Sequence, residues 1–316
     1  MTGTVDQNPT PGRARSGTDA AVLSNVHVVA GGHEILRGVD LSLERGDLAV
    51  LVGPNGAGKS TVLRTLVGRI RPTQGRATIG GRDVSEMSGV ERAGKVSWLP
   101  QIADVREPIR VLDLVAAGRF RFRESQVRSE TAARTALETF GIGELAERRW
   151  YGLSGGERQR IALATLWTQE APLLLLDEPA NHLDPAHQID TYRWIGEVVR
   201  GGGAEHGILC VTHDVDLIGW LAPSGSSVRI VGISDGRIRF QLPWESDDIV
   251  AALSELFAVD FEPVDVGGVR RLLVSGAGTS HDGARSTGSR RAGARSDDTR
   301  NDGNRSSQTR GSEVRP

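Results

Sequence analysis

One glycine-rich stretch constrains the fold of this chain more than any other, namely Gly53-Pro54-Asn55-Gly56-Ala57-Gly58-Lys59-Ser60-Thr61. It lies between an apolar run at 48–52, typical of a buried parallel strand, and residues 62–67, whose apolar positions recur at helical spacing. A strand, a glycine loop and a helix in this order predict a phosphate-binding loop. The glycines let successive backbone N–H groups point at a phosphate, and the helix N-terminus adds partial positive charge. Lys59 can reach the outer phosphates, and the Ser60 hydroxyl can bind magnesium.

The alternative for this stretch is a glycine-rich turn that matches the pattern by chance. The chain has 40 glycines, but Lys59 and Lys95 are its only lysines. A chain of this composition should match the whole pattern by chance only about 0.005 times. Phosphate binding is therefore the better interpretation.

The order of strand and helix patterns predicts an α/β fold. Apolar runs at 96–99, 173–176 and 208–211 join the run at 48–52, as expected of a parallel sheet covered on both faces. Strand patterns at 23–29 and 77–79, each followed by a Gly-Gly turn, predict a short antiparallel layer beside this sheet. The expected fold is a P-loop NTPase parallel-sheet core with an antiparallel β layer and an inserted helical subdomain.

Composition and pattern divide the chain into four segments. Residues 1–19 and 276–316 are rich in Gly, Arg, Asp, Ser or Thr and are predicted to be disordered tails, the second a solvated tail rather than a basic arm for lipid or RNA. The main domain is expected over 20–243, and at about 102–153 it contains a helical pattern without strand signals. Residues 244–275 are expected to form a small C-terminal extension, with a helix and a hairpin.

The bulk composition excludes several classes of protein. The net charge of −2 gives no global field that favours nucleic acid or an acidic membrane, and no apolar run approaches the length of a membrane span. Residues 1–18 lack the apolar core of a signal peptide. Cys210, the single cysteine, lies in an apolar run and is expected to be a core thiol in a reducing compartment. We therefore expect a cytoplasmic protein that reaches a membrane only through a partner.

Two adjacent carboxylates follow the apolar run at 173–176. Because ligands of parallel sheets bind at the carboxyl ends of the strands, Asp177 and Glu178 should face the phosphate loop. Asp177 is then placed to hold magnesium, directly or through water, and Glu178 to polarise an attacking water. The alternative is a strand that ends at a charged turn. A pair of carboxylates in a chain that already carries a phosphate loop favours the catalytic interpretation.

A second glycine motif, Leu153-Ser154-Gly155-Gly156-Glu157, opens another predicted helix. Ser154 and Glu157 match a capping box, which needs no function. Two glycines in the first turn argue against capping alone, because each costs about 1 kcal/mol of helix stability relative to Ala. Glycines there leave backbone N–H groups open to close approach by a phosphate. Since the chain has one loop for one triphosphate, this helix is expected to contact a nucleotide held by another subunit.

Together with Gln101, Asn181-His182-Leu183-Asp184 and Thr212-His213-Asp214, these motifs occur in the order and spacing of the ATP-binding-cassette (ABC) ATPases. The sequence resembles that family over about residues 22–240, and a helix that begins LSGGE is peculiar to it. The resemblance implies that two subunits sandwich two ATP molecules head to tail, the LSGGE helix of one facing the phosphate loop of the other. The nucleotide-binding residues would then be Gly53, Pro54, Asn55, Gly56, Ala57, Gly58, Lys59, Ser60, Thr61, Ser154, Gly155, Gly156 and Asp184.

The resemblance also implies roles for single residues, with ATP and Mg²⁺ as the bound species. The catalytic residues would be Glu178, His213 and Gln101, and His213 would bind the γ-phosphate and orient Glu178. Gln101 would contact magnesium and the attacking water and link them to the helical subdomain. The magnesium ligands would be Ser60, Gln101 and Asp177, while Asp184 would lie in a loop that communicates across the dimer.

One position departs from the family pattern. The family usually stacks adenine on an aromatic residue just after the first strand, and Ala30 occupies that place here. His27 or His33 could replace the aromatic ring, or the base could be held loosely. Loss of stacking forfeits on the order of 1 kcal/mol, which weakens affinity without abolishing it.

Within the family, the segments 182–188 and 117–120 look like the importers of iron–siderophore, haem and vitamin B12. Zinc and manganese importers share the Leu99-Pro100-Gln101 region and are one alternative; a soluble ABC ATPase of iron–sulphur cluster assembly is another. The expected partners are a second copy of the chain, integral-membrane permease subunits and, indirectly, an extracytoplasmic substrate-binding protein, with no nucleic acid. The protein would be cytoplasmic and peripheral on the inner face of the cell membrane, through the permease.

Overall fold

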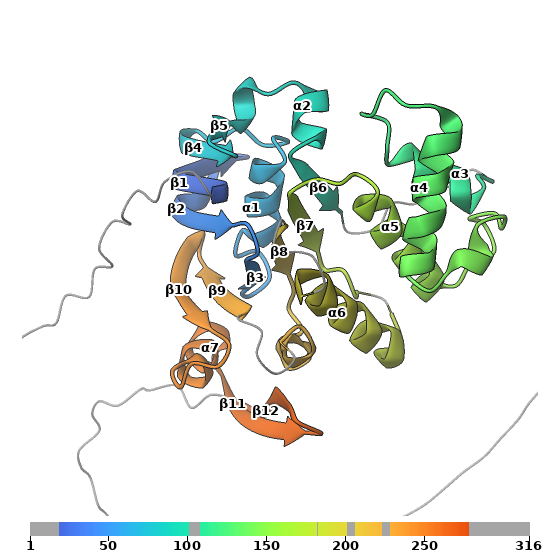
Figure 1. The fold of residues 1–316 in the computed structure, drawn as a ribbon. Helices are drawn as coiled ribbons and strands as arrows, with labels where there is room; N and C mark the ends of the chain where they lie inside the picture. Colours follow the sequence, from blue (N-terminus) through green and yellow to red (C-terminus); the bar gives the residue numbers. More distant parts are fainter. Residues whose placement is uncertain (1–18, 101–107, 182, 201–205, 223–227, 278–316) are drawn as a thin grey trace, which may run out of the picture. The chain divides into compact units, whose positions relative to one another are not determined.

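The computed structural model describes residues 19–100, 108–181, 183–200, 206–222 and 228–277 (Figure 1). The strands are β1 (Asp19–Ala30), β2 (His33–Glu44), β3 (Leu48–Val52), β4 (Gln74–Ile79), β5 (Arg82–Asp83), β6 (Val96–Leu99), β7 (Leu173–Asp177), β8 (Gly207–Val211), β9 (Val228–Ser234), β10 (Arg237–Pro243), β11 (Val259–Val266) and β12 (Val269–Ala277). The helices are α1 (Lys59–Leu66), α2 (Gly89–Ala93), α3 (Val111–Ala117), α4 (Gln126–Thr139), α5 (Gly155–Trp167), α6 (Pro185–Arg200) and α7 (Ile249–Phe257), with short 3₁₀ turns that include η2 (Gly143–Leu145) and η4 (Val215–Trp220).

The central element is a six-stranded sheet of order β10-β9-β3-β8-β7-β6. Its strands β6 to β9 and β3 pair in parallel, and β10 is antiparallel to β9. Every residue of β3, β7 and β8 is buried, so both faces of the sheet are covered. Alternate residues enter different cores: Leu48 and Val50 pack on one side, Ala49 and Leu51 on the other. The predicted α/β class and parallel core are confirmed.

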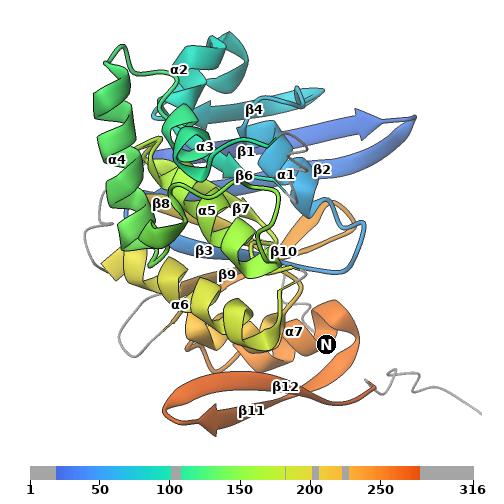
Figure 2. The ribbon, with the colours of Figure 1, turned by 90° about the vertical axis from the view of Figure 1, so that its right-hand side faces the viewer.

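One face of this sheet is covered by helices. Buried residues of α3, α4, α5, α6 and α7 belong to one hydrophobic cluster with Leu48, Leu174 and Ile208 of the sheet. Figure 2 shows α3 to α6 along this side. In the described part of 108–172 the regular elements are helices, apart from an isolated bridge between Arg110 and Arg149, so the predicted helical insertion is present.

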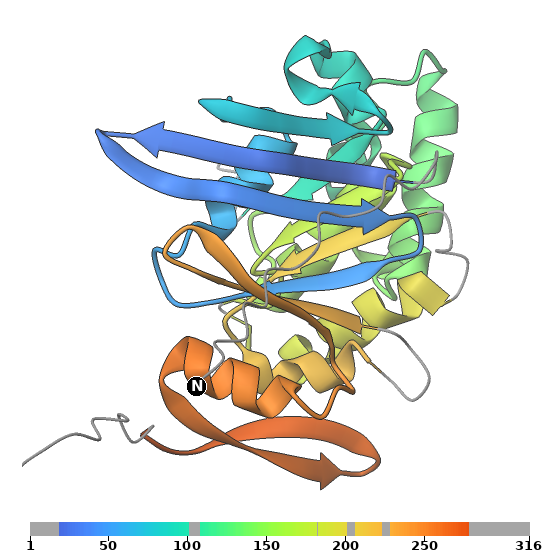
Figure 3. The same cartoon turned by 90° about the vertical axis from the view of Figure 1, so that its left-hand side faces the viewer.

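The other face carries α1 and the predicted antiparallel layer. This layer is a four-stranded sheet of order β2-β1-β4-β5, seen in front of α1 in Figure 3. Val62, Leu63 and Leu66 of α1 share a core with Leu51 of β3 and Leu23 of β1. The helix that follows the phosphate loop is therefore held between two sheets.

The C-terminal elements pack into the main core. Trp244 just after β10, Leu253 of α7 and Leu272 of β12 are almost fully buried and belong to the cluster that includes residues of β3. Asp19 lies in β1 and Ala277 in β12, so these strands reach slightly past the boundaries predicted for the tails; residues 1–18 and 278–316 lie outside the described residues. Over the described ranges, no helix is both long and apolar enough to cross a bilayer.

Candidate active site

The phosphate loop joins β3 to α1, and its glycines are required by the backbone. Gly58 has φ +103°, and a Cβ there would lie 2.7 Å from a methyl group of Leu36. A Cβ on Gly53 would lie 2.0 Å from the carbonyl oxygen of Ile233. Gly56 has φ +80° but open space around it. The loop is thus closely packed against its neighbours at Gly53 and Gly58 and open at Gly56, where a ligand can approach. The first N–H groups of α1 have no partner within the helix and can bind such a ligand.

Lys59 curls back over this loop. Its ammonium donates to the carbonyl oxygens of Gly53 at 2.6 Å and Pro54 at 3.0 Å. Burial lowers the pKa of Lys59, an effect that Glu178 and Asp177 oppose electrostatically. A cation held beside the N-terminus of a helix is suited to a polyanion such as a triphosphate.

Asp177 lies beside the phosphate loop, as predicted. The Ser60 hydroxyl donates to Asp177 Oδ1 at 3.3 Å, although the two residues are 117 positions apart. The Asp177 side chain is buried, and this burial raises its pKa. A hydroxyl oxygen next to a buried carboxylate is a donor set that fits Mg²⁺, which prefers oxygen ligands and binds through few carboxylates.

Strand register brings Glu178 and His213, two of the predicted catalytic residues, to the same edge. Val211 of β8 pairs with Leu51 of β3 and with Asp177 of β7, so the carboxyl ends of these three strands meet. Glu178 follows β7 and His213 follows β8, and His213 Nδ1 lies 3.3 Å from Glu178 Oε1. The predicted pairing of these two side chains is therefore present in the geometry.

Glu178 has an unusual backbone. Its φ is +51°, a left-handed conformation that is uncommon outside glycine, and its N–H donates to Val211 O at 2.9 Å. Asn181 Nδ2 donates to the second carboxylate oxygen at 2.7 Å. Strained residues of this kind cluster at functional sites because the surrounding structure has to hold them. The carboxylate of Glu178 lies between Asn181 Nδ2 and His213 Nδ1.

Two contacts in the site were not anticipated from the sequence. One is the contact of the Asn181 amide with Glu178, since the sequence pattern assigns no role to Asn181. The other is the hydrogen bond between Tyr192 OH and Thr212 Oγ1, 2.6 Å long, while Thr212 Oγ1 also accepts from Asp214 N. Tyr192 is a fully buried residue of α6, so this hydrogen bond links Thr212, the residue before His213, to the core. Its helical spacing marks it only as a core residue, and no sequence signal reveals this contact.

The Ser154 helix begins as predicted. Ser154 caps α5 by accepting from Glu157 N at 3.2 Å, and Glu157 reciprocates by accepting from Ser154 N at 2.7 Å. The side chain of Gln159 donates to Pro179 O, which links α5 to the residue after Glu178. Ser154 and Gly155 are exposed, as a phosphate-reading end requires. Gly156 is instead buried, so access by phosphate cannot by itself explain this glycine.

The remaining predicted positions differ in how they are placed. Asp184 is exposed and caps α6, accepting from His187 N at 3.1 Å. Gln101 lies outside the described residues, so its expected contacts with magnesium and water stay predictions. Ala30 ends β1 and pairs with His33 at the start of β2. The ring of His27 contacts Glu34 and Asn25, which makes His27 a poor substitute for an aromatic residue that stacks on adenine.

This fold and site define a P-loop nucleoside triphosphatase with a second helix N-terminus suited to phosphate. A family profile described as ABC transporter matches residues 36–181. The chain is 38% identical over 200 residues to the hemin import ATP-binding protein HmuV of Pseudomonas fluorescens, which covers 62% of this chain and 77% of that protein. With HmuV of Streptomyces coelicolor it is 36% identical over 258 residues, 81% of this chain and 88% of that one.

Solved structures agree on the fold. A metal-chelate type ABC transporter in an inward-facing conformation matches with a TM-score of 0.68 and 22% identity, over 81% of this chain and 97% of that one. A dimeric ATP-binding cassette with ADP and phosphate matches with a TM-score of 0.62 and 23% identity, over 72% and 99%. The chain belongs to the ABC transporter family, and it is an ATPase of that family.

Proposed function

We propose that this ATPase works as a head-to-tail homodimer and powers import of a metal chelate of the haem, iron–siderophore or vitamin B12 type through a separate membrane permease. The relatives support the cargo class: besides the two haem import proteins, a cobalamin import ATP-binding protein of Halobacterium salinarum is 37% identical over 225 residues, 68% of this chain and 53% of that one. These names favour chelates over zinc or manganese ions and over cluster assembly.

The dimer proposal rests on one observation: the two helix ends that are expected to bind phosphate belong to different layers of the subunit. Helix α1 packs in the core on one face of the central sheet, and α5 packs in the core on the opposite face. The Lys59 loop and the exposed Ser154 end therefore belong to different layers of one subunit. A head-to-tail pair would place the Ser154 end of each subunit over the Lys59 loop of the other.

Hydrolysis would use the groups gathered at the edge of the sheet. Lys59 and the loop N–H groups would hold the phosphates, and Ser60 with Asp177 would hold magnesium, which when bound neutralises phosphate charge. Glu178, aimed by Asn181 and His213, would polarise water for in-line attack. His213, 46% exposed, is accessible to a γ-phosphate from the open side.

The helical insertion offers a surface for the permease. Phe120 is 65% exposed and Tyr151 is 75% exposed, both outside the hydrophobic core. Exposed aromatic side chains are enriched where proteins meet partners. We assign the permease contact to this region, which would place the protein on the cytoplasmic face of the membrane.

The test uses Glu178→Gln, with Glu144→Gln, an exposed glutamate of η2, as the matched control. Glu178→Gln should retain ATP binding, lose most turnover and form a dimer with ATP and Mg²⁺ in size-exclusion chromatography with light scattering; Glu144→Gln should behave as the parent. A Glu178→Gln protein that stays monomeric, or hydrolyses normally, would contradict the proposal. With the co-purified permease in vesicles, haem, a ferric siderophore or cobalamin should stimulate turnover, and stimulation only by Zn²⁺ or Mn²⁺ would reassign the cargo.

A further inference from the structure

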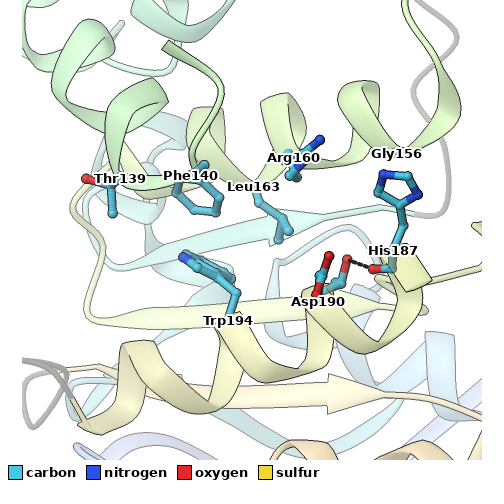
Figure 4. A pocket seen from close by; sticks show the side chains of 9 residues that line it. Thr139, Phe140, Gly156, Arg160, Leu163, His187, Asp190 and Trp194 are labelled. Atoms are coloured by element: carbon cyan, nitrogen blue, oxygen red, sulfur yellow. Dashed lines mark hydrogen bonds between the residues drawn. The ribbon is translucent and has the colours of Figure 1, made fainter. Parts of the chain in front are cut away.

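His187 occupies a position between two functional segments of the same subunit. It lies in the first turn of α6, three residues after Asp184, and its ring lies against the first turn of α5. Figure 4 shows its imidazole beside Gly156, at one end of a cavity between α5 and α6. Neither its spacing nor its residue type marks this role in the sequence.

On one side His187 is fixed to Asp184. The His187 N–H donates to Asp184 Oδ1 at 3.1 Å, and His187 Nδ1 lies 2.5 Å from Asp184 Oδ2. Thr191 Oγ1 donates to the carbonyl oxygen of His187 at 2.8 Å, the dashed line in Figure 4. Both carboxylate oxygens of Asp184 therefore contact His187, and this contact also lowers the pKa of Asp184. The orientation of Asp184 thus depends on this imidazole.

On the other side the ring takes the place of a side chain at Gly156. A Cβ on Gly156 would lie 2.7 Å from His187 Cδ2, 2.8 Å from Cγ and 3.0 Å from Nε2. Such distances are too short for a carbon–carbon contact, whose optimum lies at about 3.5–4.0 Å. The glycine therefore makes room for the imidazole, and this explains why it is buried.

The cavity next to the His187 ring provides space into which the ring could be displaced. It has a volume of about 190 Å³ and is lined by Phe140, Trp194, Arg160 and Asp190, among others. A ring displaced by a side chain at position 156 would turn towards this space and lengthen its 2.5 Å contact with Asp184.

We propose that His187 is a positioning residue that couples the Asp184 loop to the N-terminus of α5, so that both meet the partner's nucleotide as one unit. The inference deepens the proposed function and rests on it. His187 touches no reacting atom; it sets the spacing between Asp184 and the Ser154–Gly156 turn. Without it, each subunit would still bind ATP in its own loop, but closure of the dimer would require the two segments to be ordered separately.

A double-mutant cycle tests the coupling. Gly156→Ala, His187→Ala and the double variant are compared, with Gly89→Ala in the first turn of α2, where a Cβ meets nothing within 4 Å, as the matched control. His187→Ala should lower turnover about tenfold, as expected for loss of a hydrogen bond to a charged group, and leave nucleotide affinity of the monomer unchanged. His187→Gln, which keeps an amide donor for Asp184, should recover part of this loss.

The result that decides is the effect of Gly156→Ala in the two backgrounds. With His187 present, it should lower turnover at least tenfold; with His187→Ala, the further loss that it causes should be at least fivefold smaller. Equal losses in both backgrounds would overturn the proposal, because Gly156 would then be required by phosphate alone. The same cycle measured as urea midpoints, without nucleotide, should also be non-additive. The urea midpoints do not depend on dimerisation, so they test the contact between His187 and Gly156 even if the parent protein proves not to dimerise. Failure of this inference can therefore be distinguished from failure of the proposed dimer.

Discussion

Replacing Ser154 separates its capping role from its proposed contact with the partner's phosphate. Two helices carry the same capping box: Ser154 with Glu157 on α5, and Ser88 with Glu91 on α2. The cap bonds are nearly equal, since the Ser154 and Ser88 hydroxyls accept at 3.2 and 3.3 Å. Ser→Ala at an N-cap costs about 1 kcal/mol, so both variants should melt about 2–4 °C lower than the parent.

Activity should distinguish these two variants. A loss of about 1 kcal/mol leaves a protein of ordinary stability almost entirely folded, so Ser88→Ala should keep its ATPase rate. Ser154→Ala also loses a hydroxyl that we place on a phosphate, and a hydrogen bond to a charged group contributes about 1.5–3 kcal/mol. The ATPase rate of Ser154→Ala should therefore fall on the order of 10- to 100-fold.

The assay is steady-state phosphate release at saturating ATP, measured over a range of protein concentrations, beside thermal melts of each variant. Ser154→Gly adds a useful control, because glycine caps nearly as well as serine: its melting temperature should stay close to that of the parent while its activity is lost. If Ser154→Ala and Ser88→Ala showed equal melting shifts and equal, undiminished turnover, Ser154 would be a helix cap and nothing more.

Two further predictions concern stability. Burial raises the pKa of Asp177 above its ordinary 3.8, so the folded state binds the carboxyl proton more tightly than the unfolded chain does. The free energy of unfolding therefore falls as the pH rises from the pKa of the unfolded state to that of the folded state. Asp177→Asn should therefore unfold at higher urea than the parent at pH 7, with a gap that narrows towards pH 4; a gap constant with pH would contradict this. Trp244→Ala should cost about 3–5 kcal/mol in urea unfolding, because the ring is buried in the main core, whereas Trp244→Phe should cost less, since the indole N–H has no hydrogen-bond partner in the described chain.

The nucleotide loop could be predicted from the sequence because its chemistry is contiguous. Nine neighbouring residues supply the glycine bends, the cation and the helix start, and their flanking patterns predict the strand and the helix. Ser154 could be identified as a cap for the same reason, since its partner Glu157 lies three residues away. The complete burial of β3, β7 and β8 likewise follows from apolar runs that only a sheet covered on both faces can bury.

Only the tertiary structure decided which distant side chains meet. Strand register brings Glu178 to His213, a pairing that only the family resemblance predicts, and the buried Tyr192 contacts Thr212, the residue before His213. The sequence also does not reveal why residue 156 is a glycine. Its place in the motif indicates access for a phosphate, whereas the structure shows the His187 imidazole in the space that a side chain would occupy. Local patterns report the conformation of one segment. Contacts between helices depend on how whole surfaces pack, and so they emerge only when the chain is folded.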